Sequence, residues 1–318
     1  NPVEFDYIVD PFTDNSSFAQ DVYDCGVLNT TNAVYTMNTS IIPTGSISSC
    51  INITASNITL NCNGYFIRNT TLAKPGIYAG DNLVNITVRN CNVTMSASSP
   101  GYGIQFNSVN NSFIINNTAN SNSFGIYLAS SSNNNLTNNT ASLNAYGIYL
   151  YSSSNNQIIN NTANLNINYG IYLSSSSNNT VSLITANSNN YGIYLTSSSN
   201  NNLTGNTANS NTNTGIYLTS SSNNTVSSIT ANSNTNTGIY LTSSSNNTLT
   251  NNNIWNCTDT TYGCLYLMGS NNNIFTGGVI NLSASNLIYF RSLSASSNNI
   301  FKDITLLGAT KNDTFLTG

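Results

Sequence analysis

The sequence predicts an all-β protein folded as a parallel β-helix (a β-solenoid) of about 10–11 coils, each of 22–23 residues. Three observations predict this fold. A Gly-Ile-Tyr-Leu segment recurs at a fixed interval, the residues between its copies are β-formers separated by Ser/Asn turn clusters, and no stretch has helical periodicity. A leucine-rich repeat has a similar period, but the leucines of its return segment are missing.

The repeat is most regular in the middle of the chain. Copies of Gly-Ile-Tyr-Leu, spaced by 22 or 23 residues, begin at Gly125, Gly147, Gly170, Gly192, Gly215 and Gly238. Degenerate copies begin at Gly76 and Gly103. Stacked at about 4.8 Å, about eleven coils would form a rod about 50 Å long. We expect an N-terminal arm and cap in residues 1–49, the β-helix in residues 50–305 and a C-terminal end segment in residues 306–318.

Alternation along each copy assigns its side chains to two faces. Tyr146, Ile148 and Leu150 are expected to point into the coil and Tyr149 outward. The outward aromatic ladder then consists of Tyr127, Tyr149, Tyr172, Tyr194, Tyr217 and Tyr240. Such a ladder can support the sheet, pack against a second copy or stack on sugar rings. A separate, shielded column, in which stacked Asn side chains can bond to one another, holds Asn117, Asn139, Asn161, Ile184, Asn206 and Ile229.

Charged residues are scarce. Lys+Arg number 6 and Asp+Glu 10 among 318 residues, His is absent, and no acid, Lys or Arg occurs between Asn90 and Thr258. General acid–base catalysis needs a group with a pKa near the working pH, and histidine is the commonest metal ligand. We therefore expect no enzyme and no catalytic, cofactor-binding or metal-binding residues. Six cations also argue against nucleic acid as a partner.

Cysteines and glycosylation sequons favour a secreted protein at the cell surface. No apolar run reaches the roughly 18 residues of a membrane span, so none is expected. The six cysteines contain no CxxC pair, and we prefer the disulfides Cys25–Cys50, Cys62–Cys91 and Cys257–Cys264. N-linked glycans are expected at Asn-X-Ser/Thr sequons. Candidates are Asn15, Asn29, Asn38, Asn52, Asn85, Asn135, Asn202, Asn246 and Asn312.

The two ends of the chain carry opposite charge. Six of the ten acids lie in residues 1–49, and three of the six cations lie near the C-terminus. A solenoid also has open ends that can form repeating contacts. The expected outcome is self-association into a homopolymer by head-to-tail stacking. Candidate subunit contacts are Val3, Phe5, Tyr7, Ile8, Phe12, Arg291, Lys302 and Lys311.

The motif Gly-Ile-x-Leu-x-x-Ser-x-x-Asn-x-Ile/Val, present from Gly170 to Val181, resembles the right-handed parallel β-helix repeat of the NosD-like and pectate-lyase-like superfamily. The resemblance covers residues 50–305 and implies a right-handed solenoid. In that superfamily the lyases and hydrolases carry clusters of charged residues on one face of the solenoid, and this sequence has no such cluster. The opening, with Cys25-Gly26 and Cys50-Ile51, resembles the start of secreted archaeal members.

These observations favour one function over two alternatives. The favoured function is a non-enzymatic, glycosylated extracellular structural protein, a subunit of a filament, sheath or layer assembled end to end. The alternative is a glycan-binding or adhesion module at the cell surface, which would contact glycans along the tyrosine column. A polysaccharide lyase or epimerase is the least favoured class, because the charged residues that such catalysis uses are missing from the coils.

Overall fold

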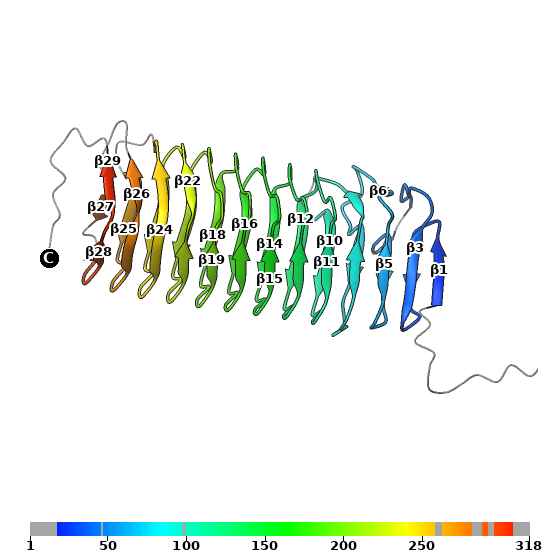
Figure 1. Cartoon of the computed structure of the whole chain (residues 1–318). Helices are drawn as coiled ribbons and strands as arrows, with labels where there is room; N and C mark the ends of the chain where they lie inside the picture. Colours follow the sequence, from blue (N-terminus) through cyan, green and yellow to red (C-terminus); the bar gives the residue numbers. More distant parts are fainter. Residues whose placement is uncertain are drawn as a thin grey trace, which may run out of the picture.

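The computed structural model of the chain describes residues 18–45, 47–97, 100–257, 263–281, 288–291 and 296–307. It confirms the predicted fold class. The described residues form an all-β parallel solenoid of about eleven turns and contain no helix. Figure 1 shows the strands side by side along a rod, in chain order from β1 (Phe18–Val22) to β29 (Thr305–Leu307).

Two long parallel sheets run the length of the rod. The first contains, in spatial order, β2 (Gly26–Leu28), β4 (Ile51–Ile53), β7 (Ile77–Ala79), β10 (Tyr102–Asn107), β12 (Phe124–Ala129), β14 (Tyr146–Tyr151), β16 (Tyr169–Ser174), β18 (Tyr191–Thr196), β20 (Thr214–Thr219), β23 (Thr237–Thr242), β25 (Leu265–Met268) and β27 (Ile288–Arg291). Its register aligns equivalent residues of successive copies, for example Ile148 with Ile171 and Tyr149 with Tyr172. Each side chain therefore lies beside its counterpart in the next coil.

The second sheet contains three-residue strands in the middle coils and longer strands towards both ends. Its order is β1, β3 (Ala33–Met37), β5 (Thr59–Asn61), β8 (Thr87–Arg89), β11 (Phe113–Ile115), β13 (Asn135–Thr137), β15 (Gln157–Ile159), β17 (Thr180–Ser182), β19 (Asn202–Thr204), β21 (Thr225–Ser227), β24 (Thr248–Trp255), β26 (Ile274–Asn281) and β28 (Ile300–Lys302), with β22 (Thr230–Asn232) beside β24 and β29 beside β26. The third side of the coil pairs β6 (Phe66–Arg68) with β9 (Asn92–Thr94) and continues as single bridges such as Thr118↔Thr140. Regular pairing begins at β1, before the expected start of the solenoid at residue 50.

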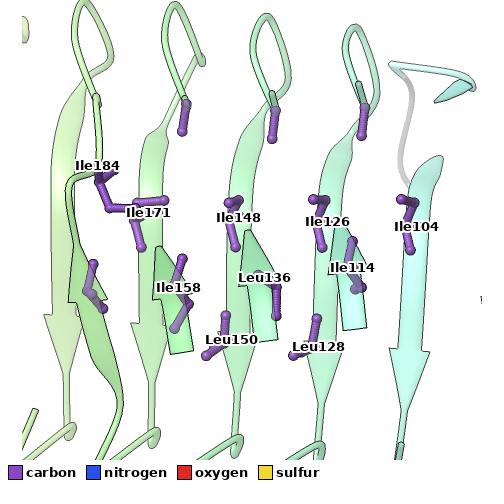
Figure 2. Close-up of a cluster of buried hydrophobic side chains, with 14 of the residues drawn as sticks. Ile104, Ile114, Ile126, Leu128, Leu136, Ile148, Leu150, Ile158, Ile171 and Ile184 are labelled. Atoms are coloured by element: carbon purple, nitrogen blue, oxygen red, sulfur yellow. The ribbon is translucent and has the colours of Figure 1, made fainter. Parts of the chain in front are cut away.

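The core is a set of aliphatic rows between the sheets. Figure 2 shows Ile148 and Ile171 of the first sheet beside Leu136 and Ile158 of the second. All four side chains are buried. Burying one such side chain stabilises the fold by about 1.5–3 kcal/mol, so the repeat of aliphatic positions is the main source of stability.

Ladders of asparagine satisfy the polar groups at the corners. The Asn117 Nδ2 donates to Asn139 Oδ1 over 3.0 Å, and the Asn139 Nδ2 donates to Asn161 Oδ1 over 3.0 Å. This confirms the predicted bonding between stacked Asn side chains. Where isoleucine interrupts the column, the Asn206 Oδ1 accepts the backbone N–H of Ile184 over 2.9 Å. The Asn206 side chain thus accepts a backbone hydrogen bond from the preceding coil even where that coil has no Asn in the column.

The repeated glycine breaks the alternation of the first sheet. In β14 the burial sequence places Gly147 and Ile148, two consecutive residues, inside, while Tyr146 and Tyr149 are half-buried. A Cβ on Gly192 would lie 2.6 Å from the carbonyl oxygen of Gly215 in the next coil, so only glycine fits at this point. The prediction that Tyr146 points into the coil is therefore wrong: its ring stacks on Tyr149 outside, with centroids 5.7 Å apart.

Candidate functional site

Two rows of rings cover the outer side of the first sheet, and we call this surface the aromatic face. The residues before the repeated glycines form the pre-glycine row: Tyr102, Phe124, Tyr146, Tyr169 and Tyr191. The residues two positions after the glycines form the post-glycine row: Tyr127, Tyr149, Tyr172, Tyr194, Tyr217 and Tyr240. Strict alternation across the glycine predicts only the post-glycine row. The sequence signal for the pre-glycine row is an aromatic residue directly before glycine in successive copies.

Neighbouring rings of the post-glycine row stack on one another along the rod. Tyr172 and Tyr194 have centroids 5.2 Å apart and planes 6° apart, and Tyr217 and Tyr240 have centroids 4.5 Å apart and planes 8° apart. The faces of these rings are therefore directed at their neighbours. The row offers ring edges and phenol hydroxyls to solvent and is a ladder that supports the sheet.

Stacking also changes the acidity of the phenols. Burial, as the first cause, raises the pKa above the ordinary value of 10.0 for Tyr102, Tyr127, Tyr149, Tyr169, Tyr172, Tyr191, Tyr194 and Tyr217. For Tyr149 the second cause is repulsion from the neighbouring phenolates of Tyr172 and Tyr127. These hydroxyls stay protonated at neutral pH, so the face is an uncharged array of groups that both donate and accept hydrogen bonds.

The pre-glycine row ends at Tyr191. Its register partner in β20 is Thr214, and the partner of Thr214 in β23 is Thr237, so two coils lack the ring that the preceding coils carry. A groove of about 260 Å³ occupies this place, and we call it the Tyr191 groove. Tyr191, Tyr217 and Tyr240 line it with rings.

The polar lining of the Tyr191 groove comes from inserted residues. Asn213 and Asn236 occupy turns that are one residue longer than the turn before Tyr191. The Asn213 Nδ2 donates to the Tyr191 hydroxyl over 2.8 Å, and the Asn236 Nδ2 donates to Asn213 Oδ1 over 2.9 Å. The Thr214 hydroxyl also donates to Asn213 Oδ1, over 3.1 Å. These bonds hold the amides in fixed positions beside the rings.

The structure contains the disulfides Cys25–Cys50, Cys62–Cys91 and Cys257–Cys264. The first two join successive coils near the N-terminal end, and the third closes a local loop. Crosslinks of this kind reduce the entropy of the unfolded chain and strengthen the ends of a solenoid, where each coil has a neighbour on one side alone.

Most predicted subunit contacts lie outside the described residues, namely Val3, Phe5, Tyr7, Ile8, Phe12 and Lys311. The backbone of Arg291 lies in β27. Lys302 is exposed in β28, and its Nζ is 4.0 Å from the carboxylate of the adjacent Asp303. End-to-end assembly stays a prediction.

The glycosylation candidates fall into three groups. Asn15 and Asn312 lie outside the described residues. Asn52 and Asn135 are partly buried. The exposed candidates are Asn29, Asn38, Asn85, Asn202 and Asn246. Attachment of glycans at these sites stays a prediction.

Side chains that commonly ligate metals are scattered over the part of the chain that the structure describes. The described residues contain no group of three or more His, Cys, Asp or Glu side chains that could hold a metal ion. Met37 and Met95 are buried in the core, and every cysteine is in a disulfide. The third methionine, Met268, is half-buried and lines the Tyr191 groove. Within the described residues, no helix is long and apolar enough to cross a membrane.

Two family profiles match the sequence. The profile described as "Right handed beta helix region" matches residues 32–208, more than half of the chain. The profile described as "Periplasmic copper-binding protein (NosD)" matches residues 162–303. No curated protein matches the sequence.

Several solved structures share the fold at low identity. A mutant of the periplasmic alginate epimerase AlgG superposes with a TM-score of 0.71 at 15% identity, over 88% of this chain and 76% of that chain. The A-module of the Azotobacter vinelandii mannuronan C-5 epimerase AlgE4 gives a TM-score of 0.58 at 15% identity, over 95% and 89%. The Dettilon tailspike protein gp208 gives 0.56 at 14% identity, over 91% and 60%.

These neighbours overturn the prediction that the chain is not an enzyme. That prediction rested on the absence of ionisable side chains from the coils. Solved solenoids that align with most of this chain are nevertheless alginate epimerases by name, and they do not favour a purely structural role. At about 15% identity the likeness concerns the fold. Enzymatic activity is therefore no longer excluded for this chain, because a solenoid of this shape is compatible with modification of a polysaccharide.

Proposed function

The chain belongs to the right-handed β-helix family, and on that basis we propose that it binds a neutral polysaccharide along its aromatic face. The observation that carries the proposal is the aromatic face itself. Half-buried tyrosines line up over successive coils at the spacing of the strands, from Tyr102 to Tyr240. A surface that repeats along a rod matches a ligand that repeats along its own length. The face combines apolar ring edges with hydroxyls, the two kinds of contact that a sugar polymer offers.

Charge favours a neutral polymer over an acidic one. Between Asn90 and Thr258 the chain has no Lys or Arg that could pair with a carboxylate, and its net charge is −4. An anionic chain such as alginate would lose hydration on the aromatic face without gaining an ion pair. A neutral glycan avoids this cost. This distinguishes the proposed ligand from that named in the titles of the epimerase structures.

Three disulfides support a location outside the reducing cytoplasm. A protein outside the cytoplasm can meet extended polysaccharides. The location at the cell surface is part of the proposal. Glycosylation of the exposed sequons would fit the same location, because N-linked glycans are attached to surface residues of secreted proteins.

The proposal is tested by native gel electrophoresis in gels that contain a neutral polysaccharide (glucomannan or hydroxyethyl cellulose) or alginate. We expect retardation by at least one neutral polymer, none by alginate, and little change when salt is raised, because no ion pair is involved. Absence of retardation by neutral polymers, or retardation by alginate that salt removes, would contradict the proposal. Proton NMR of the recovered polymer shows whether it has also been modified.

A matched pair of triple variants locates the binding surface. The first variant removes three rings of the post-glycine row by Tyr149→Thr, Tyr172→Thr and Tyr194→Thr. Threonine is chosen because it replaces a ring in later coils, as Thr214 does. Gln157→Ala, Asn202→Ala and Thr225→Ala change three exposed residues on the outer side of the second sheet. We expect the first variant to lose retardation and the second to keep it, with both folded by circular dichroism.

A further inference from the structure

The end of the pre-glycine row leaves a place for a ring, and we propose that the Tyr191 groove binds one pyranose ring of the polysaccharide. The inference rests on the proposed function and names the point where the polymer is held most tightly. Upstream, each pre-glycine ring stacks on the next, as Tyr169 does on Tyr191 with centroids 5.4 Å apart. Downstream of Tyr191 the register partner is Thr214, so the row offers no further ring to stack on Tyr191.

The size of the groove fits one sugar ring. Its volume is about 260 Å³. Pockets for drug-sized ligands begin at about 300 Å³, so the groove holds a single ring and not a folded chain. The groove lies in line with the pre-glycine row, because Thr214 and Thr237 take the register positions of the missing rings. A polymer lying along the aromatic face can therefore place one unit in the groove while its neighbours remain on the surface.

The rings beside the groove provide an apolar wall. Between neighbouring rings within each row the faces cover one another, so a sugar cannot stack between them. Tyr191 keeps a diagonal contact with Tyr217 of the post-glycine row, whose ring stacks on it with centroids 5.8 Å apart, but it has no ring partner of its own row in the next coil. On the side that adjoins Thr214, Tyr191 therefore lacks the pre-glycine neighbour that each earlier ring of the row has in the next coil.

The amides beside the groove supply matched polar groups. Asn213 is fully engaged, since its Nδ2 donates to Tyr191 and its Oδ1 accepts from Thr214 and Asn236. Asn236 uses one Nδ2 hydrogen in this chain, and its Oδ1 and second Nδ2 hydrogen have no partner among the described residues. A donor and an acceptor on one fixed amide match two neighbouring hydroxyls of a neutral sugar. No charged side chain lines the groove, which favours a neutral ring over a uronate.

Filling the groove is the decisive test. Thr214→Tyr adds the ring that Tyr191 carries one coil earlier, so the substitution follows the pattern of the chain itself. Binding of cellohexaose and mannohexaose is measured by isothermal titration calorimetry for the wild-type protein, Thr214→Tyr, Asn236→Ala and Tyr191→Ala. We expect at least one hexasaccharide to bind the wild type, and each variant to weaken that binding about tenfold or more, the size of one good aromatic contact or of a lost hydrogen bond to a fixed amide.

Two controls separate the groove from the rest of the surface. Gln157→Ala in β15 and Thr225→Ala in β21 change exposed residues of the second sheet, outside both the aromatic face and the groove; both should bind within about twofold of wild type. The groove assignment is overturned if Thr214→Tyr binds the hexasaccharides like wild type, or if the wild type retains the polymer in gels but binds neither hexasaccharide. In both cases the proposed function survives. Loss of polymer retention by the wild type itself contradicts the proposed function instead.

Discussion

The coils before and after Tyr191 share one interior but differ on their outer face. Ile171, Ile193 and Ile216 are equally buried, and each pairs with its counterpart in the next coil. Outside, the earlier coils carry two ring rows and the later ones carry one, because Thr214 and Thr237 replace rings. The interior of the repeat therefore sets the fold, whereas the pre-glycine position on the outer side differs between coils and can create a groove.

Raising the pH should have the largest effect, because it acts on many rings at once. Folding raises the pKa of tyrosines in both rows, including Tyr149, Tyr191 and Tyr217, above the ordinary value of 10.0. The folded state therefore holds these protons more tightly than the unfolded state, and stability is fully present below pH 10 and is lost as the pH rises above it.

The measurement is the melting temperature between about pH 7 and pH 12, with tyrosinate absorbance followed in parallel. We expect a flat profile up to about pH 9 and a steep fall above pH 10, with phenols of the folded protein ionising later than those of the chain in denaturant. A melting temperature that stays constant up to pH 12 would show that stacking does not hold the phenols neutral.

Substitution of the repeated glycine should destabilise both regions equally. An added Cβ lies 2.6 Å from the Gly215 carbonyl oxygen at Gly192 and 2.7 Å from the Gly238 carbonyl oxygen at Gly215. Gly192→Ala and Gly215→Ala should each lower the free energy of unfolding by about 3 kcal/mol, as overpacking against backbone does. Urea unfolding followed by circular dichroism measures both.

The control for the glycine variants is Gly26→Ala in β2, where nothing lies within 4 Å of an added Cβ. It should change the free energy of unfolding by less than about 0.5 kcal/mol. A small effect at Gly192 would mean that the close approach between coils does not require glycine, and the account of the outward Tyr146 would fail with it.

The asparagine column offers a graded comparison between the two regions. Asn139 Oδ1 accepts from both the backbone N–H and the Nδ2 of Asn117 over 3.0 Å, whereas Asn206 Oδ1 accepts from the Ile184 N–H alone. Asn139→Ala removes the acceptor of the buried Asn117 N–H and of one Asn117 Nδ2 hydrogen, while the Nδ2 keeps its bond to the Val88 carbonyl oxygen. It should cost about 2 kcal/mol, and Asn206→Ala should cost about 1 kcal/mol. Equal losses in urea unfolding would show that the contact between side chains in the ladder contributes nothing.

The smallest expected effect is a gain in stability. Thr214→Tyr extends the pre-glycine row by one ring and should raise the free energy of unfolding by about 1 kcal/mol, the contribution of one aromatic pair. Thr212→Tyr places the same side chain on an exposed turn and should give no gain. Destabilisation by Thr214→Tyr would indicate that the Tyr191 groove is too narrow for a ring.

The fold could be predicted from the sequence because its signal is repeated. Each coil is too small to bury its apolar residues alone, so the period of Ile148, Ile171 and Ile193 implies stacking. The shielded Asn column followed from the exchange of Asn161 for Ile184, since only a position inside the fold accepts both residues.

The candidate site was predicted only in half. The post-glycine row followed from alternation, but the pre-glycine row and the groove did not. Alternation assumes an unbroken pleat, and the close approach of neighbouring carbonyls at the glycines breaks it. The sequence shows that Thr214 replaces an aromatic residue, but it does not show whether this replacement leaves a groove. That depends on which rings lie beside Thr214 in the assembled coils.

The solenoid, its period and the scarcity of charge in its coils follow from the amino-acid sequence. Stacking repeats every side chain at about 4.8 Å, so that only residues tolerant of identical neighbours, such as Ile, Asn, Ser, Thr and Tyr, can recur. That Tyr146 and its equivalents point outward, and that their row ends in a groove, becomes visible only in the assembled coils. The outward direction depends on the 2.6 Å approach that a Cβ at Gly192 would make to the next coil. The groove depends on Thr214 and Thr237, which take the register positions of rings. Both features depend on contacts between residues far apart in the chain.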